Sequence, residues 1–270
     1  MASPEAVVPD YIGVIGVEEA RRTTLVHSSG TLTTCDCAVV LELRNQISAH
    51  DALSIDDKHK NKRRVYVDQP PQNFLQTHAP QVVTKLLRAA AAAFDRGGWG
   101  GKQANHNRND PNEEDGPLKG LDVHKLSIRF VECWEYSVGG SLQDKLHYDK
   151  GSVITVVVLL SNDFDGGVFR TYESDDTHLE HPMNIGDSVC FLSHKYHNIT
   201  EVTRGVRNTL VMELWQGVPR WSLEMRSLRF SHDGDFDEHG MSIPCTEVPG
   251  CPDDFEDCFD DAELSDAYLD

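Results

Sequence analysis

The sequence predicts a mainly β protein with flanking helices and a double-stranded β-helix core of the jelly-roll, cupin-like kind. After residue 120, strand patterns follow one another closely and helical patterns are few, as such a core requires. The run Val153–Leu160 is apolar on both faces, which indicates a fully buried strand. Over 207–215, Leu210, Met212 and Leu214 alternate with a second set of residues, which indicates another strand of the same core.

Two helices are expected before this β-rich region. The first spans Cys35–Ile47, with Thr34 as its cap, and its apolar positions share one face: Val40, Leu43 and Ile47. The second spans Pro80–Arg96, because proline suits a first helical turn and Gly97 ends the pattern. We expect this second helix to pack on the outside of the sheet through one apolar stripe: Val82, Val83, Leu86, Leu87, Ala90 and Phe94.

Two further strands and one long loop complete the pattern upstream of residue 153. A short strand is expected at Arg64–Val67 and a long one at Leu126–Tyr136, where apolar and aromatic residues recur with one parity. The segment 97–120 is rich in Gly, Asn, Asp and Pro, which indicates a loop. A loop of this length is either disordered or a lid over a binding site.

The negative charge of the chain is unevenly distributed. Of the formal net charge of −19, −14 falls in Phe230–Asp270, which has 14 acidic residues and no Lys or Arg, and −5 falls in the rest. An acidic segment with few aromatic residues buries too little apolar surface to offset the entropy of ordering, so we predict that it is disordered. It either keeps the protein in solution or docks a basic partner. The acidic balance disfavours nucleic acid as a partner, because phosphate backbones are bound by basic surfaces.

These patterns divide the chain into three regions. They are an N-terminal extension (1–33), one domain (34–230) whose core motifs lie within 126–216, and the acidic tail (231–270). No run of 18 apolar residues occurs, so neither a membrane span nor a membrane partner is expected. The first residues lack the basic and apolar regions of a secretory signal, and the seven cysteines lack zinc-finger spacing. A reduced protein of the cytoplasm or nucleus is therefore expected.

Three residues are candidate metal ligands. His147 and Asp149 are separated by one residue, so their side chains would point to the same side of a β-strand. Together with the distant His197 they make a facial set of two histidines and one carboxylate. That ligand set suits non-haem Fe(II) oxygenases.

An arginine near the third candidate ligand predicts an anion site. Arg207 follows His197 by ten residues, across a turn at Gly205, and begins the buried strand over 207–215. A buried inward arginine needs an anionic partner, and the guanidinium pairs bidentately with a carboxylate. Thr209 lies on the same face of the strand and would add a hydroxyl donor.

Several motifs in this part of the chain resemble a known family. They are His147-x-Asp149, the buried strand, the turn Phe164-Asp165-Gly166-Gly167, Gly186-Asp187 before a strand ending at Phe191, and His197 with Arg207 after nine intervening residues. Together they resemble the 2-oxoglutarate- and Fe(II)-dependent dioxygenases, and within them the prolyl 4-hydroxylase-type catalytic domain. The motifs cover Trp134–Trp215, and a weaker match extends upstream to Thr34.

The resemblance implies a set of roles and cofactors. His147, Asp149 and His197 would hold Fe(II), and 2-oxoglutarate would chelate the metal while Arg207 and Thr209 hold its distal carboxylate. O2 would take the last metal position, the products would include succinate and CO2, and L-ascorbate would be a further cofactor. His194 is the alternative to His197, but the register of the family matches His197.

Two more residues match family positions beside 2-oxoglutarate. Tyr136 corresponds to a tyrosine on the strand before the first ligand, although the gap is eleven residues here and nine in the family. Its alternative role is that of an ordinary core aromatic residue. Thr155 matches a threonine of the next strand. Leu159 stands where the family often has a tyrosine that binds the carboxylate, so Thr209 and Tyr136 gain importance.

The substrate is less defined than the chemistry. The prolyl 4-hydroxylase-like motifs favour a prolyl residue of a protein or peptide. The alternatives are a dioxygenase of a free amino acid or another small molecule, and a non-catalytic binding module that keeps the fold. An alkylated-nucleobase demethylase is disfavoured by the acidic balance.

Overall fold

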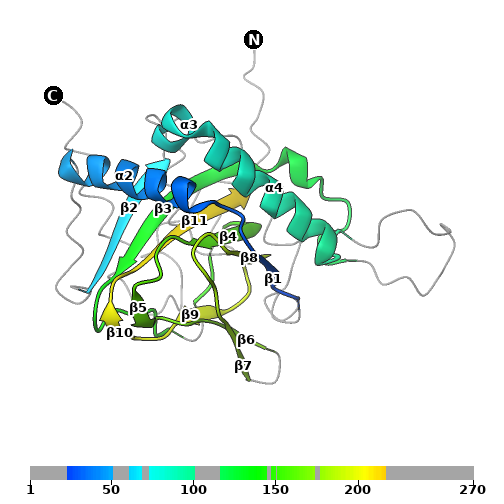
Figure 1. Ribbon diagram of the computed structural model, residues 1–270. Coiled ribbons are helices and arrows are strands. Elements are labelled where there is room, and N and C mark those ends of the chain that lie inside the picture. The colour runs from blue at the N-terminus through cyan, green and yellow to red at the C-terminus, as the bar shows by residue number, and fades with distance from the viewer. Residues whose placement is uncertain are drawn as a thin grey trace, which may run out of the picture. The chain divides into compact units, whose positions relative to one another are not determined.

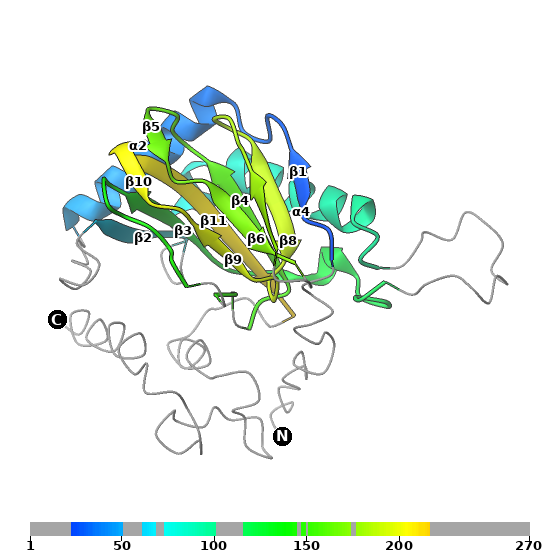
Figure 2. The same ribbon diagram turned by 90° about the horizontal axis from the view of Figure 1, so that it is seen from below.

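Two layers of antiparallel strands face each other in the computed structural model (Figures 1 and 2). The structure describes residues 23–50, 61–68, 73–100, 116–144, 147–149, 151–173 and 177–216. The larger sheet has six strands in the order β1 (Val26–Ser28), β8 (Ser188–Leu192), β4 (Ile154–Leu159), β11 (Arg207–Trp215), β3 (Ser127–Tyr136) and β2 (Lys62–Asp68).

The second layer is built from shorter strands. Its three-stranded sheet has the order β7 (His178–His181), β6 (Phe169–Tyr172) and β9 (His197–Ile199), and a two-stranded ribbon joins β5 (Phe164–Gly166) to β10 (Val202–Gly205). In Figure 2, β6 and β9 lie over β4 and β11 of the larger sheet. Strands distant in sequence thus alternate between two facing sheets, and the predicted double-stranded β-helix is confirmed.

The helices cover the outer face of the larger sheet (Figure 1). They are α2 (Thr34–His50), α3 (Phe74–His78), α4 (Pro80–Arg96) and the short 3-10 helix η3 (Val123–Lys125). The predicted bounds of α4 are confirmed, but Leu87 is 38% exposed and lies outside its buried stripe. The predicted cap of the first helix is wrong by one residue. Thr33 Oγ1 accepts from the Asp36 backbone N–H, and the Asp36 carboxylate accepts from the Thr33 N–H, a reciprocal capping pair.

The two faces of β11 belong to different cores. Leu210, Met212 and Leu214 join the apolar cluster beneath the helices. Arg207, Thr209 and Glu213 have the opposite parity and are also buried, so they belong to the face between the sheets. The predicted alternation of this strand is therefore confirmed, and it brings polar side chains into the interior of the β-helix.

The remaining sequence expectations meet the structure in part. The strands expected at Arg64–Val67, Leu126–Tyr136 and Val153–Leu160 are present as β2, β3 and β4. Residues 26–28 of the predicted N-terminal extension form β1 and pair with β8. The acidic tail and most of the 97–120 loop lie outside the described residues, so the three regions remain predictions. Within the described part, no helix has the length and apolar character needed to cross a membrane.

Candidate active site

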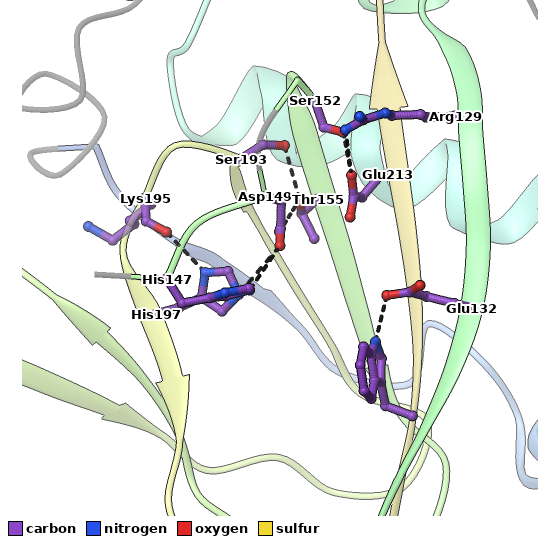
Figure 3. Close-up of polar contacts among 11 residues, drawn as sticks. Arg129, Glu132, His147, Asp149, Ser152, Thr155, Ser193, Lys195, His197 and Glu213 are labelled. Carbon is purple, nitrogen blue, oxygen red and sulfur yellow. Dashed lines mark hydrogen bonds and ion pairs between the residues drawn. The ribbon is translucent and has the colours of Figure 1, made fainter. Parts of the chain in front are cut away.

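The three predicted metal ligands lie together between the sheets (Figure 3). One ligand atom from each of His147, Asp149 and His197 lies within 4.8 Å of the other two. Asp149 Oδ1 is 3.5 Å from His147 Nε2 and 3.8 Å from His197 Nε2. Two imidazole nitrogens and one carboxylate oxygen therefore converge on one point, as a facial metal site requires.

The described residues around His147 and Asp149 do not form a regular strand, which corrects the sequence expectation. Its backbone bonds go to the segment around β8 and β9. His197 N–H donates to the His147 carbonyl at 3.0 Å, and Asp149 N–H donates to the Ser193 carbonyl at 2.9 Å. These bonds fix the two residues beside His197, and their ligand atoms converge although the segment lacks the alternation of a strand.

Thr155 and Ser193 hold the carboxylate of Asp149. The Thr155 hydroxyl donates to Asp149 Oδ2 at 2.6 Å and lies 3.0 Å from the Ser193 hydroxyl. Burial by itself raises the pKa of Asp149, but His197, His147 and the Thr155 hydroxyl outweigh it and leave the pKa below its ordinary value. Asp149 is thus kept as a carboxylate with Oδ1 directed to the histidines.

His197 is fixed by its neighbours on every side. Its Nδ1 lies 3.0 Å from the Lys195 carbonyl, which only accepts, so Nδ1 carries the proton and Nε2 is available to a metal. Phe169 and Phe191 pack on the ring with centroid distances of 5.4 and 4.8 Å. Burial lowers the pKa of His197, which favours the neutral, metal-binding form. His194, the alternative ligand, instead packs its ring against Tyr148.

Arg207 is a buried cation with no carboxylate beside it among the described residues. Its side chain is 1% exposed, and its polar contact is with the Thr209 hydroxyl at 3.5 Å. Its Nε has no hydrogen-bond partner in the described part of the chain, and the Tyr136 ring lies 5.9 Å from the guanidinium carbon. Burial lowers the pKa of Arg207 to about 10. Burying a guanidinium without a counter-charge is costly, so Arg207 is a candidate anion-binding group.

Gly167 makes room for Arg207. It has a φ of +59°, and a Cβ at this position would lie 2.7 Å from Arg207 Cδ. The Gly-Gly turn expected from the sequence therefore has a second role, since it accommodates the side chain of the arginine as well as the turn.

Gly167→Ala is expected to displace Arg207 and to weaken 2-oxoglutarate binding by tenfold or more, measured by calorimetric titration. Gly30→Ala is the control, because Gly30 has a φ of +63° with nothing within 4 Å of its Cβ position. The Gly30→Ala variant reports the free-energy cost of placing a side chain at positive φ alone, about 1–2 kcal/mol. Equal effects of the two substitutions on 2-oxoglutarate affinity would contradict the role of Gly167.

The sequence did not reveal the polar cluster beyond Thr155. Arg129 pairs with Glu213 at 3.3 Å, and the Ser152 hydroxyl donates to the same carboxylate; all three residues are buried. Burial raises the pKa of Glu213, and the charge of Asp149 raises it further. The inward parity of Glu213 was readable from the sequence. The inward position of Arg129 was not readable, because the pairing register of β3 and β11 shifts beside it, between Glu213 and Leu214.

The predicted cofactor-binding residues Thr155 and Thr209 have different contacts, so we expect different roles for them. Its hydroxyl is bonded to Asp149, whereas Thr209 contacts Arg207. Thr155→Val is therefore expected to weaken metal binding by about 10–100-fold, as for other groups that orient a metal ligand. Thr209→Val is expected to leave metal affinity unchanged and to lower 2-oxoglutarate affinity. Titrations of both variants with metal and then with 2-oxoglutarate test this, and a metal affinity of Thr155→Val equal to wild type would refute it.

Comparison with known proteins gives likenesses in structure. No protein-family model matches the chain, and no curated protein sequence matches it. The viral collagen prolyl hydroxylase of Paramecium bursaria Chlorella virus-1, in complex with 2-oxoglutarate, is 13% identical over 74% of this chain and 98% of its own, with a TM-score of 0.46.

Two further solved structures are similar to a comparable degree. A prolyl hydroxylase from Trichoplax adhaerens, in complex with a peptide fragment of the hypoxia inducible factor oxygen degradation domain, is 10% identical over 77% of this chain and 90% of its own, with a TM-score of 0.45. HygX from Streptomyces hygroscopicus, with nickel and 2-oxoglutarate bound, is 14% identical over 73% and 84%, with a TM-score of 0.44. These are likenesses of fold.

Proposed function

We propose that this protein is an Fe(II)- and 2-oxoglutarate-dependent dioxygenase that hydroxylates a prolyl residue of a protein or peptide. One observation supports the proposal most strongly. A convergent set of two histidines and one carboxylate lies in the same β-helix interior as a buried arginine that has no carboxylate partner in the described part. Such an arginine requires an anionic ligand, and such a metal site has coordination positions left for one.

The residues present fit both groups. His147, Asp149 and His197 would hold Fe(II), and Arg207 with Thr209 would bind the distal carboxylate of 2-oxoglutarate. Tyr136 adds its ring beside the guanidinium. When bound, iron and 2-oxoglutarate would supply oxidation by O2, in which one oxygen atom enters the succinate formed together with CO2 and the other is inserted into a C–H bond of the substrate. L-ascorbate is part of this proposal through the family resemblance alone.

The chain itself supplies orientation. Thr155 and Ser193 hold Asp149, and the Lys195 carbonyl sets the tautomer of His197. Phe169 and Phe191 exclude water from the His197 ring. Ligands that are oriented in advance bind a metal without a cost in reorganisation.

The test is an anaerobic titration of the protein with Fe(II) and then with 2-oxoglutarate. We expect the visible charge-transfer band of the chelate, and we expect it to be lost in Asp149→Ala. Succinate release is then measured with proline-containing peptides and with free amino acids. Dependence on peptide supports the proposal, and dependence on a free amino acid assigns the protein to small-molecule chemistry. A well-folded protein that shows no band would instead be a binding module.

A further inference from the structure

A buried lysine lies two residues before the metal ligand His197. The Lys195 side chain is 1% exposed, and its Nζ is 3.0 Å from Glu173 Oε2. A charged group this deeply buried is stable only when it is paired, so the position of the Lys195 side chain is tied to that of Glu173.

The same lysine supplies the hydrogen bond that orients His197. Its backbone carbonyl accepts from His197 Nδ1–H at 3.0 Å (Figure 3), and its N–H donates to the Leu192 carbonyl at 2.7 Å. The side chain of Lys195 points away from the metal ligands in Figure 3. The carbonyl and the ammonium belong to one residue in a tight turn, so anchoring the ammonium restricts where the carbonyl lies.

Glu173 is itself held in place from the strand next to His197. The Thr171 hydroxyl donates to Glu173 Oε1 at 2.9 Å and lies 2.7 Å from His181 Nε2. Thr171 is fully buried and stands directly opposite His197 in the β6–β9 pairing. The contacts run from Thr171 to Glu173, from Glu173 to Lys195, and from the Lys195 carbonyl to the Nδ1–H of His197. The series therefore begins and ends beside the candidate ligand His197.

We infer that Lys195 and Glu173 are positioning residues for His197, and that their ion pair sets the imidazole tautomer and ring orientation that metal binding needs. The inference rests on the proposed metal site and is independent of the substrate. Neither residue belongs to the proposed set of metal ligands. A pair with only a structural role would contribute to folding and leave the ligand unaffected.

The experiment measures Co(II) binding by calorimetry to the metal-free full-length chain. Lys195→Met and Glu173→Gln each remove one charge at nearly constant volume. We expect each to weaken Co(II) binding by about 10–100-fold, the range for groups that orient a metal ligand. The control replaces Arg170 and Glu180 with alanine, because they form an exposed ion pair on β6 and β7 with an Nε–Oε1 distance of 3.0 Å. The control is expected to bind Co(II) as the wild type does.

The double variant Lys195→Met/Glu173→Gln separates positioning from folding. It leaves neither charge of the pair without its partner, so its Tm should lie closer to that of the wild type than the Tm of either single variant does. Its Co(II) affinity should stay low, because the anchor of the carbonyl is still missing. Recovery of both Tm and affinity would overturn the inference.

A second measurement needs no metal at all. The ¹⁵N shifts of the His197 imidazole report the tautomer in the metal-free protein. We expect the Nδ1–H form in the wild type and a mixture of tautomers in the double variant. An unchanged tautomer would overturn the inference. Failure of the wild type to bind Co(II), with the tautomer shift still present, would count against the proposed metal site only.

Discussion

Replacement of His147 by alanine is expected to abolish turnover and to lower Fe(II) affinity by more than about 100-fold. Replacing a group that merely orients a metal ligand lowers metal affinity by about 10–100-fold, and removing a ligand itself should lower it by more. The His147 side chain is 36% exposed, so its loss should leave the fold intact. The measurements are Fe(II) titration under anaerobic conditions, succinate release and circular dichroism.

The matched control is His178→Ala. His178 is an exposed histidine of β7 whose ring contacts Tyr172 and lies outside the ligand group. It should bind Fe(II) and release succinate as the wild type does. Turnover by folded His147→Ala at a tenth of the wild-type rate or more would remove His147 from the ligand set.

Replacement of Arg207 by alanine should raise the Kd for 2-oxoglutarate by about 30-fold to several thousand-fold. Removing one partner of a buried, hydrogen-bonded charge pair costs about 2–5 kcal/mol, and each 1.4 kcal/mol is tenfold in Kd. Fe(II) affinity should change far less, because the guanidinium is not a metal ligand. Calorimetric titrations with Fe(II) and with 2-oxoglutarate measure the two constants separately.

The stability of an Arg207 variant provides a second check. Arg207→Met fills much of the same volume and removes a buried charge that has no carboxylate partner among the described residues. We therefore expect its Tm without 2-oxoglutarate to be at or above that of the wild type. Added 2-oxoglutarate should raise the Tm of the wild type and leave that of Arg207→Met unchanged.

Arg204→Ala is the control for both Arg207 variants. Arg204 lies on β10, three residues before Arg207, and pairs at the surface with Asp163 and Asp165. Its side chain is 61% exposed, so its loss should change stability by at most about 1 kcal/mol. An equal loss of 2-oxoglutarate affinity in Arg204→Ala and Arg207→Ala would contradict the proposed carboxylate clamp.

Local sequence patterns were sufficient for most of the fold. The bounds of α4, the buried β4 strand and the alternation of β11 follow from the spacing of apolar residues, which reflects the periods of helix and strand. The pattern did not identify the true cap of α2, because Thr33 and Thr34 are chemically equivalent and only the capping bonds with Asp36 distinguish them. Short elements such as β1 have too few residues for a period to emerge.

The sequence by itself determined the candidate ligands of the site and their order along the chain. His147, Asp149, His197 and Arg207 were identified from spacing and residue chemistry together with the family resemblance, and the structure brings one ligand atom of each of the first three within 4.8 Å of the others. Only the tertiary structure decided which residues hold them. The Thr155 hydroxyl donates to Asp149. The Lys195 carbonyl accepts from His197, and the Lys195 ammonium pairs with Glu173. These contacts span six residues between Thr155 and Asp149 and 22 between Lys195 and Glu173, and they depend on which strands pair and in which register. Local periodicity carries no information about either, because register is set by pairing with another part of the chain.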